Sequence, residues 1–139
     1  MEKFQITIRE LVRCYQAFEQ LSSRHIRTMD LTPAQFDIIA TLGNTQGMSC
    51  RELGEKTLIT KGTLTGVLDR LETRGIVHRE IIQDNRRSFR VYLSPLGENL
   101  FNSTFNQHLE YIRPFFENLS ETKLSEITRT LAELRNQFK

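Results

Sequence analysis

The chain has 139 residues, of which 38% are hydrophobic and 26% charged, a composition typical of a globular protein rather than a disordered or fibrous one. Its formal net charge is only +2, and the excess lies in residues 49–90, which hold nine basic and six acidic residues. Its apolar runs are too short to span a bilayer, and its N-terminus lacks the apolar run of a signal peptide, so we expect a cytoplasmic protein without a membrane partner.

The N-terminal part of the chain is predicted to form two helices. In residues 3–28 apolar side chains recur at steps of three and four, which is the period of an amphipathic helix. Thr32 is a good N-cap and Pro33 suits a first helical position, so a second, short helix is expected to run from there to Gly43.

The next segment has the pattern of a helix-turn-helix. Ser49 is expected to cap a third helix with Glu52 as its capping-box partner, and Leu53 and Leu58 are expected to form its narrow buried face. Thr60 is the next predicted N-cap, and the fourth helix should stop at Gly75. Its inward stripe consists of Leu64, Val67, Leu68 and Leu71. Two short helices joined by a tight turn make the helix-turn-helix motif.

A change of period from about 3.6 to 2 predicts a β-hairpin after this motif. Phe89, Val91 and Leu93 should face one way, and Val77 and Ile81 likewise on the preceding strand. Residues 84–87 between the strands have turn chemistry. The hairpin is the wing of a winged helix-turn-helix.

Helical pattern resumes at Ser94 and Pro95, with Pro114 expected to bend or end that helix and Ser120 to cap the last one. The last helix carries a narrow, coiled-coil-like seam formed by Leu124, Ile127, Leu131, Leu134 and Phe138. Such a seam needs a facing helix, which a symmetric second copy can supply; the alternative is that it packs within its own chain.

Two places on this scaffold are candidates for DNA contact. The first is the polar start of the fourth helix, where short side chains would let the backbone approach a major groove: Thr60, Lys61, Gly62, Thr63, Thr65 and, farther along, Arg70. The second is the hairpin, from which Arg86, Arg87 and Arg90 are expected to project toward phosphates or a minor groove. The alternatives are an ordinary solvated helix face and a hairpin tip charged against edge aggregation.

The motifs together resemble the MarR family of bacterial regulators over nearly the whole chain. The resemblance is carried by residues 31–36 (LTPAQF), 51–54 (RELG), 64–77 (LTGVLDRLETRGIV), 84–88 (DNRRS) and 93–97 (LSPLG). It implies a recognition helix at residues 60–74, an Arg of the wing, Arg86 by position, that reaches a minor groove, and Asp84 as the residue that orients the wing or a neighbouring Arg.

The expected fold is therefore mainly α with a small hairpin wing and about six helices. We expect one MarR-type domain over residues 1–139, with a winged helix-turn-helix at 31–97 and dimerisation helices at 1–30 and 98–139. The predicted dimer contacts are Ile8, Leu11, Leu124, Ile127, Leu131 and Leu134. Two recognition helices on half-sites roughly 10 base pairs apart imply a pseudopalindromic operator on double-stranded DNA.

The expected function is that of a sequence-specific, ligand-responsive repressor that acts as a homodimer. The family resemblance implies a small aromatic effector, and Tyr15, Phe18, Phe36 and Tyr111 are candidates to line its crevice, although an aromatic stripe is also ordinary core. The alternatives are a dimeric winged-helix adaptor that binds protein, for which the basic residues are dispensable, and a thiol-based redox sensor.

Other chemistry finds little support in the sequence. Cys14 and Cys50 are expected to be thiols, and Cys50 at a helix start beside Arg51 is the better placed for a lowered pKa. His25, His78 and His108 stand without metal-ligand spacing, and the sequence has no nucleophile elbow, phosphate-binding glycine loop or Glu-His motif. We predict no metal, no cofactor and no enzymatic activity.

Overall fold

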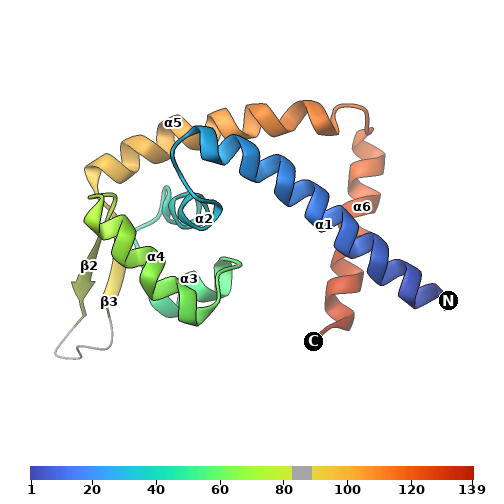
Figure 1. Cartoon of the computed structure of the whole chain (residues 1–139), viewed down its shortest axis with the longest axis horizontal. Coiled ribbons are helices and arrows are strands. Elements are labelled where there is room, and N and C mark those ends of the chain that lie inside the picture. The colour runs from blue at the N-terminus through green and yellow to red at the C-terminus, as the bar shows by residue number, and fades with distance from the viewer. Residues whose placement is uncertain (83–88) are drawn as a thin grey trace. The chain divides into compact units, whose positions relative to one another are not determined.

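The computed structural model describes residues 1–82 and 89–139, and its contacts divide the chain into two compact units, residues 1–108 and 109–139 (Figure 1). The described residues form α1 (Lys3–Thr28), α2 (Pro33–Leu42), β1 (Met48–Ser49), α3 (Cys50–Lys56), α4 (Lys61–Thr73), β2 (Val77–Ile81), β3 (Phe89–Leu93), α5 (Pro95–Ile112), the 3-10 helix η1 (Arg113–Phe116) and α6 (Glu121–Gln137). The expected fold class, mainly α with a small β wing, is confirmed.

Capping side chains fix the starts of α2 and α3 at the residues that the sequence predicted. The Thr32 hydroxyl accepts a hydrogen bond from the Gln35 backbone N–H at 3.1 Å, and the Gln35 side chain accepts one from the Thr32 N–H at 3.0 Å. Ser49 and Glu52 make the same reciprocal pair at the start of α3. Each of these reciprocal pairs is a capping box, which satisfies two backbone N–H donors that a helix start leaves without partners. The helices α2 and α3 therefore begin at defined residues.

The helix-turn-helix consists of α3, the loop of residues 57–60, and α4. Leu53 is fully buried, but Leu58 is 81% exposed, so the prediction of a buried Leu58 is wrong. The reason is that α3 ends at Lys56 and the Thr57 hydroxyl donates to the Leu53 carbonyl at 2.7 Å, which ends the helical period before Leu58. The Leu58 backbone N–H instead donates to Asp37 Oδ2 at 3.2 Å.

The wing is part of a three-stranded antiparallel sheet of order β1-β3-β2. Val77 pairs with Leu93, Arg79 with Val91 and Ile81 with Phe89, which confirms the predicted common face. Ile81 at the far end of β2 is nevertheless exposed. The two-residue strand β1, which pairs Met48 with Val91, was not predicted because two residues carry no readable alternation.

The core of the first unit lies between the helices and the sheet. Leu64, Val67, Leu68 and Leu71 of α4 are all buried, as predicted. They join fully buried residues from elsewhere in the unit: Ile38, Ile39, Leu42, Leu53, Ile76 and Val91. The chain leaves α4 at Gly75, whose φ of +76° is a conformation that glycine adopts without strain. The core thus holds α4 by one face and leaves the other outside.

The second unit contains the end of α5, η1 and α6. The α-helix gives way to a 3-10 turn at Arg113–Phe116, as the position of Pro114 predicted. Ser120 caps α6, its hydroxyl accepting from the Lys123 N–H at 3.1 Å. No residue of α6 is buried, and Leu131 in its apolar seam is 51% exposed.

Candidate nucleic-acid interface

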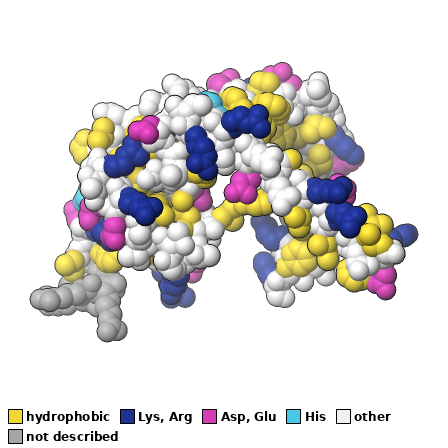
Figure 2. Space-filling model, in the orientation of Figure 1, with side chains coloured by type: hydrophobic (Ala, Val, Ile, Leu, Met, Phe, Trp, Pro, Cys, Tyr) yellow, Lys and Arg dark blue, Asp and Glu magenta, His cyan; other side chains and the backbone are white. Residues whose placement is uncertain are grey.

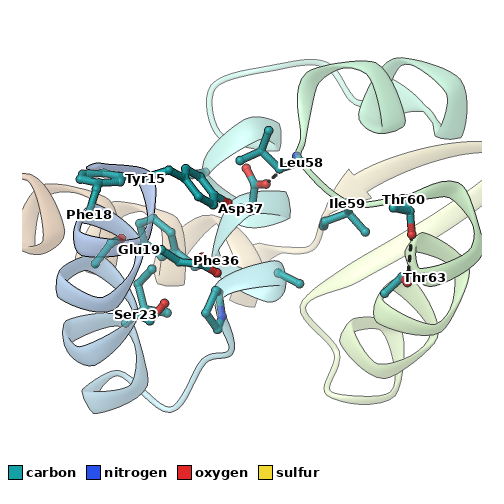
Figure 3. A pocket seen from close by; sticks show the side chains of 15 residues that line it. Tyr15, Phe18, Glu19, Ser23, Phe36, Asp37, Leu58, Ile59, Thr60 and Thr63 are labelled. Carbon is teal, nitrogen blue, oxygen red and sulfur yellow. Dashed lines mark hydrogen bonds between the residues drawn. The ribbon is translucent and has the colours of Figure 1, made fainter. Parts of the chain in front are cut away.

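The exposed face of α4 starts with short, polar side chains. Its predicted contact residues are all exposed: Thr60, Lys61, Gly62, Thr63 and Thr65. The Thr60 hydroxyl donates to the Thr63 hydroxyl at 3.1 Å (Figure 3), so these two side chains are held against the first turn. The backbone N–H groups at a helix start are donors suited to phosphate, and small side chains leave them accessible.

Two glycines on this face have no structural requirement within the chain. A Cβ placed at Gly62 or Gly66 would meet nothing within 4 Å. Each glycine inside a helix costs roughly 1 kcal/mol relative to alanine, so α4 is less stable than it could be without any gain in internal packing. The open space in front of these residues lets another molecule approach the helix backbone closely.

The start of α4 and the end of β2 at Ile81 lie on the same side of the first unit. In Figure 1, α4 begins at the lower edge of this unit, and β2 runs back down beside it after the turn at Gly75. The ribbon packs beside the C-terminal half of α4, through Arg79 with Asp69 and Glu72, while the exposed start of α4 lies at the same edge of the unit as the end of β2. A groove-binding module presents a helix and a β-ribbon on one side in this way.

Arg70 and Arg74 lie near the other end of α4, and both are exposed. Arg74 is held in place by the Asp30 carbonyl at 3.1 Å and the Gln35 side-chain oxygen at 3.3 Å, with the Asp30 carboxylate 3.6 Å away. Asp69 precedes Arg70, and Figure 2 shows dark blue and magenta side chains interleaved over this region. The surface around α4 is therefore mixed in charge rather than uniformly positive.

The wing residues proposed from the sequence divide into two groups. Asp84, Arg86 and Arg87 lie outside the described residues. Arg90 is half-buried, and its guanidinium Nη2 donates to the Gly47 carbonyl at 3.1 Å. The expectation that Arg90 projects from the ribbon is wrong, because its side chain ties β3 to the loop before β1.

Arg79 was missed by the sequence analysis and joins the wing to α4. Its Nη2 lies 2.6 Å from Asp69 Oδ1 and 2.8 Å from Glu72 Oε1, and its guanidinium carbon lies 5.4 Å from the centre of the Phe89 ring. The hydrogen bond with Glu72 is the main cause of its raised pKa, and the same bond lowers the pKa of Glu72. The alternation of β2 could have revealed Arg79, because it places this residue on the same face as Val77 and Ile81. A charged side chain on such an apolar face needs a partner.

A pocket of about 530 Å³ opens beside the start of α4. Tyr15 and Phe18 of α1, Phe36 of α2, and Thr60 and Thr63 are among its lining residues (Figure 3). Three of the four aromatic residues proposed for an effector crevice thus line one pocket. The fourth, Tyr111, is not a lining residue, and its ring centre lies 5.9 Å from that of Phe115.

The two thiols are in different environments. Cys14 is exposed on α1. Burial raises the pKa of the Cys50 thiol, and the positive charge of Arg79 only partly opposes this effect. The expectation of a lowered pKa at Cys50 is wrong, because partial burial at the start of α3 outweighs the cation.

The three histidines all have side-chain partners. His25 Nδ1 and His108 Nδ1 are 2.9 Å apart, and His78 stacks on Tyr92 with ring centres 5.1 Å apart. Within the described part of the chain, no three His, Cys, Asp or Glu side chains form a group that could hold a metal ion. The described helices also include none with the length and apolar character needed to cross a membrane.

The sequence and the fold of this chain are similar to those of known transcriptional regulators. The family model "MarR family" matches residues 31–89. The HTH-type transcriptional regulator PecS of Dickeya dadantii is 32% identical over 111 residues, which cover 78% of this chain and 67% of PecS.

Two solved structures agree over nearly the whole chain. AbsC, a MarR family transcriptional regulator from Streptomyces coelicolor, has a TM-score of 0.87 at 20% identity and covers 99% of this chain and 96% of its own. NadR in complex with 4-hydroxyphenylacetate has a TM-score of 0.75 at 25% identity and covers 96% of this chain and 93% of its own. The chain therefore belongs to the MarR family, whose members are helix-turn-helix transcriptional regulators and not enzymes.

Proposed function

We propose that the chain acts as a homodimeric, ligand-responsive repressor on a pseudopalindromic operator. In this proposal α4 enters a major groove, with Thr60, Lys61, Gly62, Thr63, Thr65 and Arg70 as its contact residues. Arg86 and Arg87 of the wing contact the adjacent minor groove and backbone, and Asp84 orients them. Arg90 supports the wing through its bond with the Gly47 carbonyl.

The observation that carries this proposal is the contrast between the two faces of α4. One face is buried in the core through four apolar residues, whereas the other presents hydroxyls and two glycines to open space. A helix built only for stability would carry alanine or longer side chains at Gly62 and Gly66. Close approach of a DNA backbone gives these glycines a function.

The domain organisation proposed with this function is a single MarR-type domain over residues 1–139. Residues 31–97 form the DNA-binding module, and residues 1–30 and 98–139 supply helices for dimerisation. The exposed apolar residues of α1 support this division: Ile8, on this helix, is 51% exposed, and Leu11 is partly exposed. A second copy would remove such residues from water.

A small aromatic effector would act through the pocket beside α4. The pocket volume of about 530 Å³ is within the range of small-molecule sites, and Thr60 and Thr63 line the pocket as well as the proposed DNA-binding face. An effector that binds better to a dimer with misplaced recognition helices lowers operator affinity by that preference.

The test is a titration of the purified chain against the intergenic DNA upstream of its own gene, with scrambled DNA in parallel, over a series of salt concentrations. We expect tight binding to the upstream DNA alone, with affinity that falls steeply as salt rises. Equal and weak binding to both sequences, followed by failure to select any site from a random DNA pool, would favour the protein-binding adaptor.

Variants in the two contact regions sharpen this test. Arg86→Ala should weaken operator binding by about 1–3 kcal/mol, because it removes the guanidinium proposed to contact the minor groove. Lys61→Ala should reduce the slope of log affinity against log salt by about one, as expected for one lost phosphate contact. Arg27→Ala and Lys3→Ala, which alter exposed basic residues of α1, are the matched controls and should change neither quantity.

A further inference from the structure

The pocket beside α4 is acidic as well as aromatic. Glu19 of α1 and Asp37 of α2 line it, and none of its described lining residues is Lys, Arg or His. In Figure 3, Tyr15 and Glu19 extend from α1, while Asp37 extends from α2 toward the loop that carries Leu58. An aromatic carboxylate placed here would face two carboxylates without a cation from the lining residues.

Asp37 is a half-buried carboxylate without a cationic partner among its principal interactions. Burial raises its pKa, and this effect exceeds the opposing hydrogen bonds from the Leu58 N–H and the Thr41 side chain. A raised carboxylate pKa means that the ionised form is less stable in this position than it is in water. A positive charge brought into the pocket would relieve that deficit, whereas a negative charge would increase it.

The aromatic rings in the pocket favour the same kind of ligand. Tyr15, Phe18 and Phe36 line the same pocket as Asp37. The face of an aromatic ring attracts a cation within about 6 Å of its centre. The rings also cover the apolar part of a ligand. Aromatic walls combined with carboxylates therefore select a molecule that is itself aromatic and positively charged.

Asp37 also joins the pocket to the recognition helix. Its Oδ2 accepts the Leu58 N–H at 3.2 Å, which anchors the loop of residues 57–60, and α4 starts directly after that loop. A ligand cation that draws the Asp37 carboxylate toward itself competes with this anchor. The pocket and the start of α4 then depend on the same hydrogen bond.

We propose that this pocket binds a small aromatic cation through Asp37 and Glu19, and that binding reaches α4 through the Asp37–Leu58 contact and lowers operator affinity. The inference deepens the proposed repressor function and rests on it for the DNA readout alone. It assigns to this chain a ligand charge opposite to that of 4-hydroxyphenylacetate, the molecule bound to NadR.

Two matched probes separate the signs of charge. Tyramine and 4-hydroxyphenylacetate share a phenol ring and a short linker, but near pH 7.5 the first is a cation and the second an anion. The neutral 4-ethylphenol measures the contribution of the rings alone. Calorimetric titration of the full-length protein without DNA should give tyramine an affinity at least tenfold above that of 4-ethylphenol, with 4-hydroxyphenylacetate the weakest of the three.

Substitutions locate the charge that is responsible. Asp37→Asn removes the charge and keeps an oxygen for the Leu58 N–H, so it should cost tyramine at least tenfold in affinity while the binding of 4-ethylphenol changes little. Glu19→Gln should act in the same direction. Glu55→Gln alters an exposed carboxylate of α3 that does not line the pocket, and it should leave tyramine binding unchanged.

The DNA readout tests the coupling. Saturating tyramine should raise the operator Kd of the wild-type protein at least fivefold, a coupling of ordinary size for linked sites. The inference is overturned if tyramine does not bind, if 4-hydroxyphenylacetate binds as tightly, if Asp37→Asn leaves tyramine affinity intact, or if bound tyramine leaves the operator Kd unchanged. Absence of operator binding by the ligand-free protein would instead count against the repressor function. It would not affect the proposed ligand site, because the calorimetric comparison of ligands uses no DNA.

Discussion

His108 lies on α5, and its side chain is nearly buried, at 7% exposure, against α1 and α2. Its Nδ1 is 2.9 Å from His25 Nδ1, its Nε2 is 3.0 Å from Ser22 Oγ, and its ring centre is 4.8 Å from that of Phe36. Two nitrogens in contact can share one proton only if one of them is unprotonated. The pair therefore cannot keep this hydrogen bond with both rings doubly protonated.

This contact makes stability depend on pH in a defined direction. Burial, and then the charge of His25, lowers the pKa of His108 below its ordinary value of 6.5. The unfolded chain thus binds more protons than the native one as the pH falls below about 6.5, so the free energy of unfolding should fall in that range. His108→Gln should flatten this dependence, while at pH 8 it should cost about 1–2 kcal/mol through lost hydrogen bonds.

The measurement is urea denaturation at fixed protein concentration, at pH 8 and at pH 5.5. His78→Gln is the control, because His78 is an exposed histidine whose side chain pairs with Glu80 at 3.5 Å. If wild type and His108→Gln lose equal stability between the two pH values, the buried pair does not control the acid response.

The helix α4 combines a buried apolar stripe with an exposed face whose two glycines lower helix stability. Gly62→Ala and Gly66→Ala should each raise the free energy of unfolding by about 1 kcal/mol, because the added methyl group meets nothing within the chain. The same methyl groups should lower operator affinity, because they occupy the space through which DNA approaches the helix backbone. Stability and DNA affinity should thus change in opposite senses.

Denaturant titration and operator binding on the same samples would measure both effects. Gly54→Ala in α3 is the matched control, because its Cβ would make only an ordinary contact with Leu64 Cδ2 at 3.9 Å. It should stabilise the protein without weakening DNA binding. Stabilised Gly62 and Gly66 variants with unchanged operator affinity would show that α4 does not approach DNA by this face.

Elements with local boundaries could be predicted from the sequence. The pairs Thr32–Gln35 and Ser49–Glu52 place helix starts through contacts three residues apart, and Pro114 ends α5 by its own geometry. Hydrophobic spacing gave the buried stripe of α4 for the same reason, since its period is a property of the segment itself.

Features set by distant residues could not be predicted in this way. The exposure of Leu58 depends on where α3 stops and on Asp37, which lies 21 residues earlier in the chain. The His25–His108 contact joins residues 83 positions apart, and the Arg90 bond to Gly47 joins residues 43 positions apart. The candidate pocket depends on such contacts too, so its aromatic residues were foreseen while its acidic character was not.

The unburied seam of α6 is the strongest reason to expect a second copy. The helix has 17 residues and no buried side chain, yet its apolar residues repeat along one face. Leu124 and Leu134 are only partly covered, and Ile127 is 36% and Leu131 51% exposed. A single helix gains nothing from such a seam, whereas two copies that face each other remove it from water.

Leu131→Asp places a charge in the middle of that seam and should convert the proposed dimer to monomers, because an unpaired carboxylate is strongly disfavoured in an apolar interface. Light scattering after size exclusion would measure the mass. Ser125→Asp, on the polar side of the same helix, is the control and should leave the mass of the proposed dimer unchanged. Operator affinity should fall with dissociation, because a monomer engages one half-site and loses the second set of contacts. A Leu131→Asp variant of dimeric mass and unchanged operator affinity would place the interface elsewhere and remove the role proposed for α6.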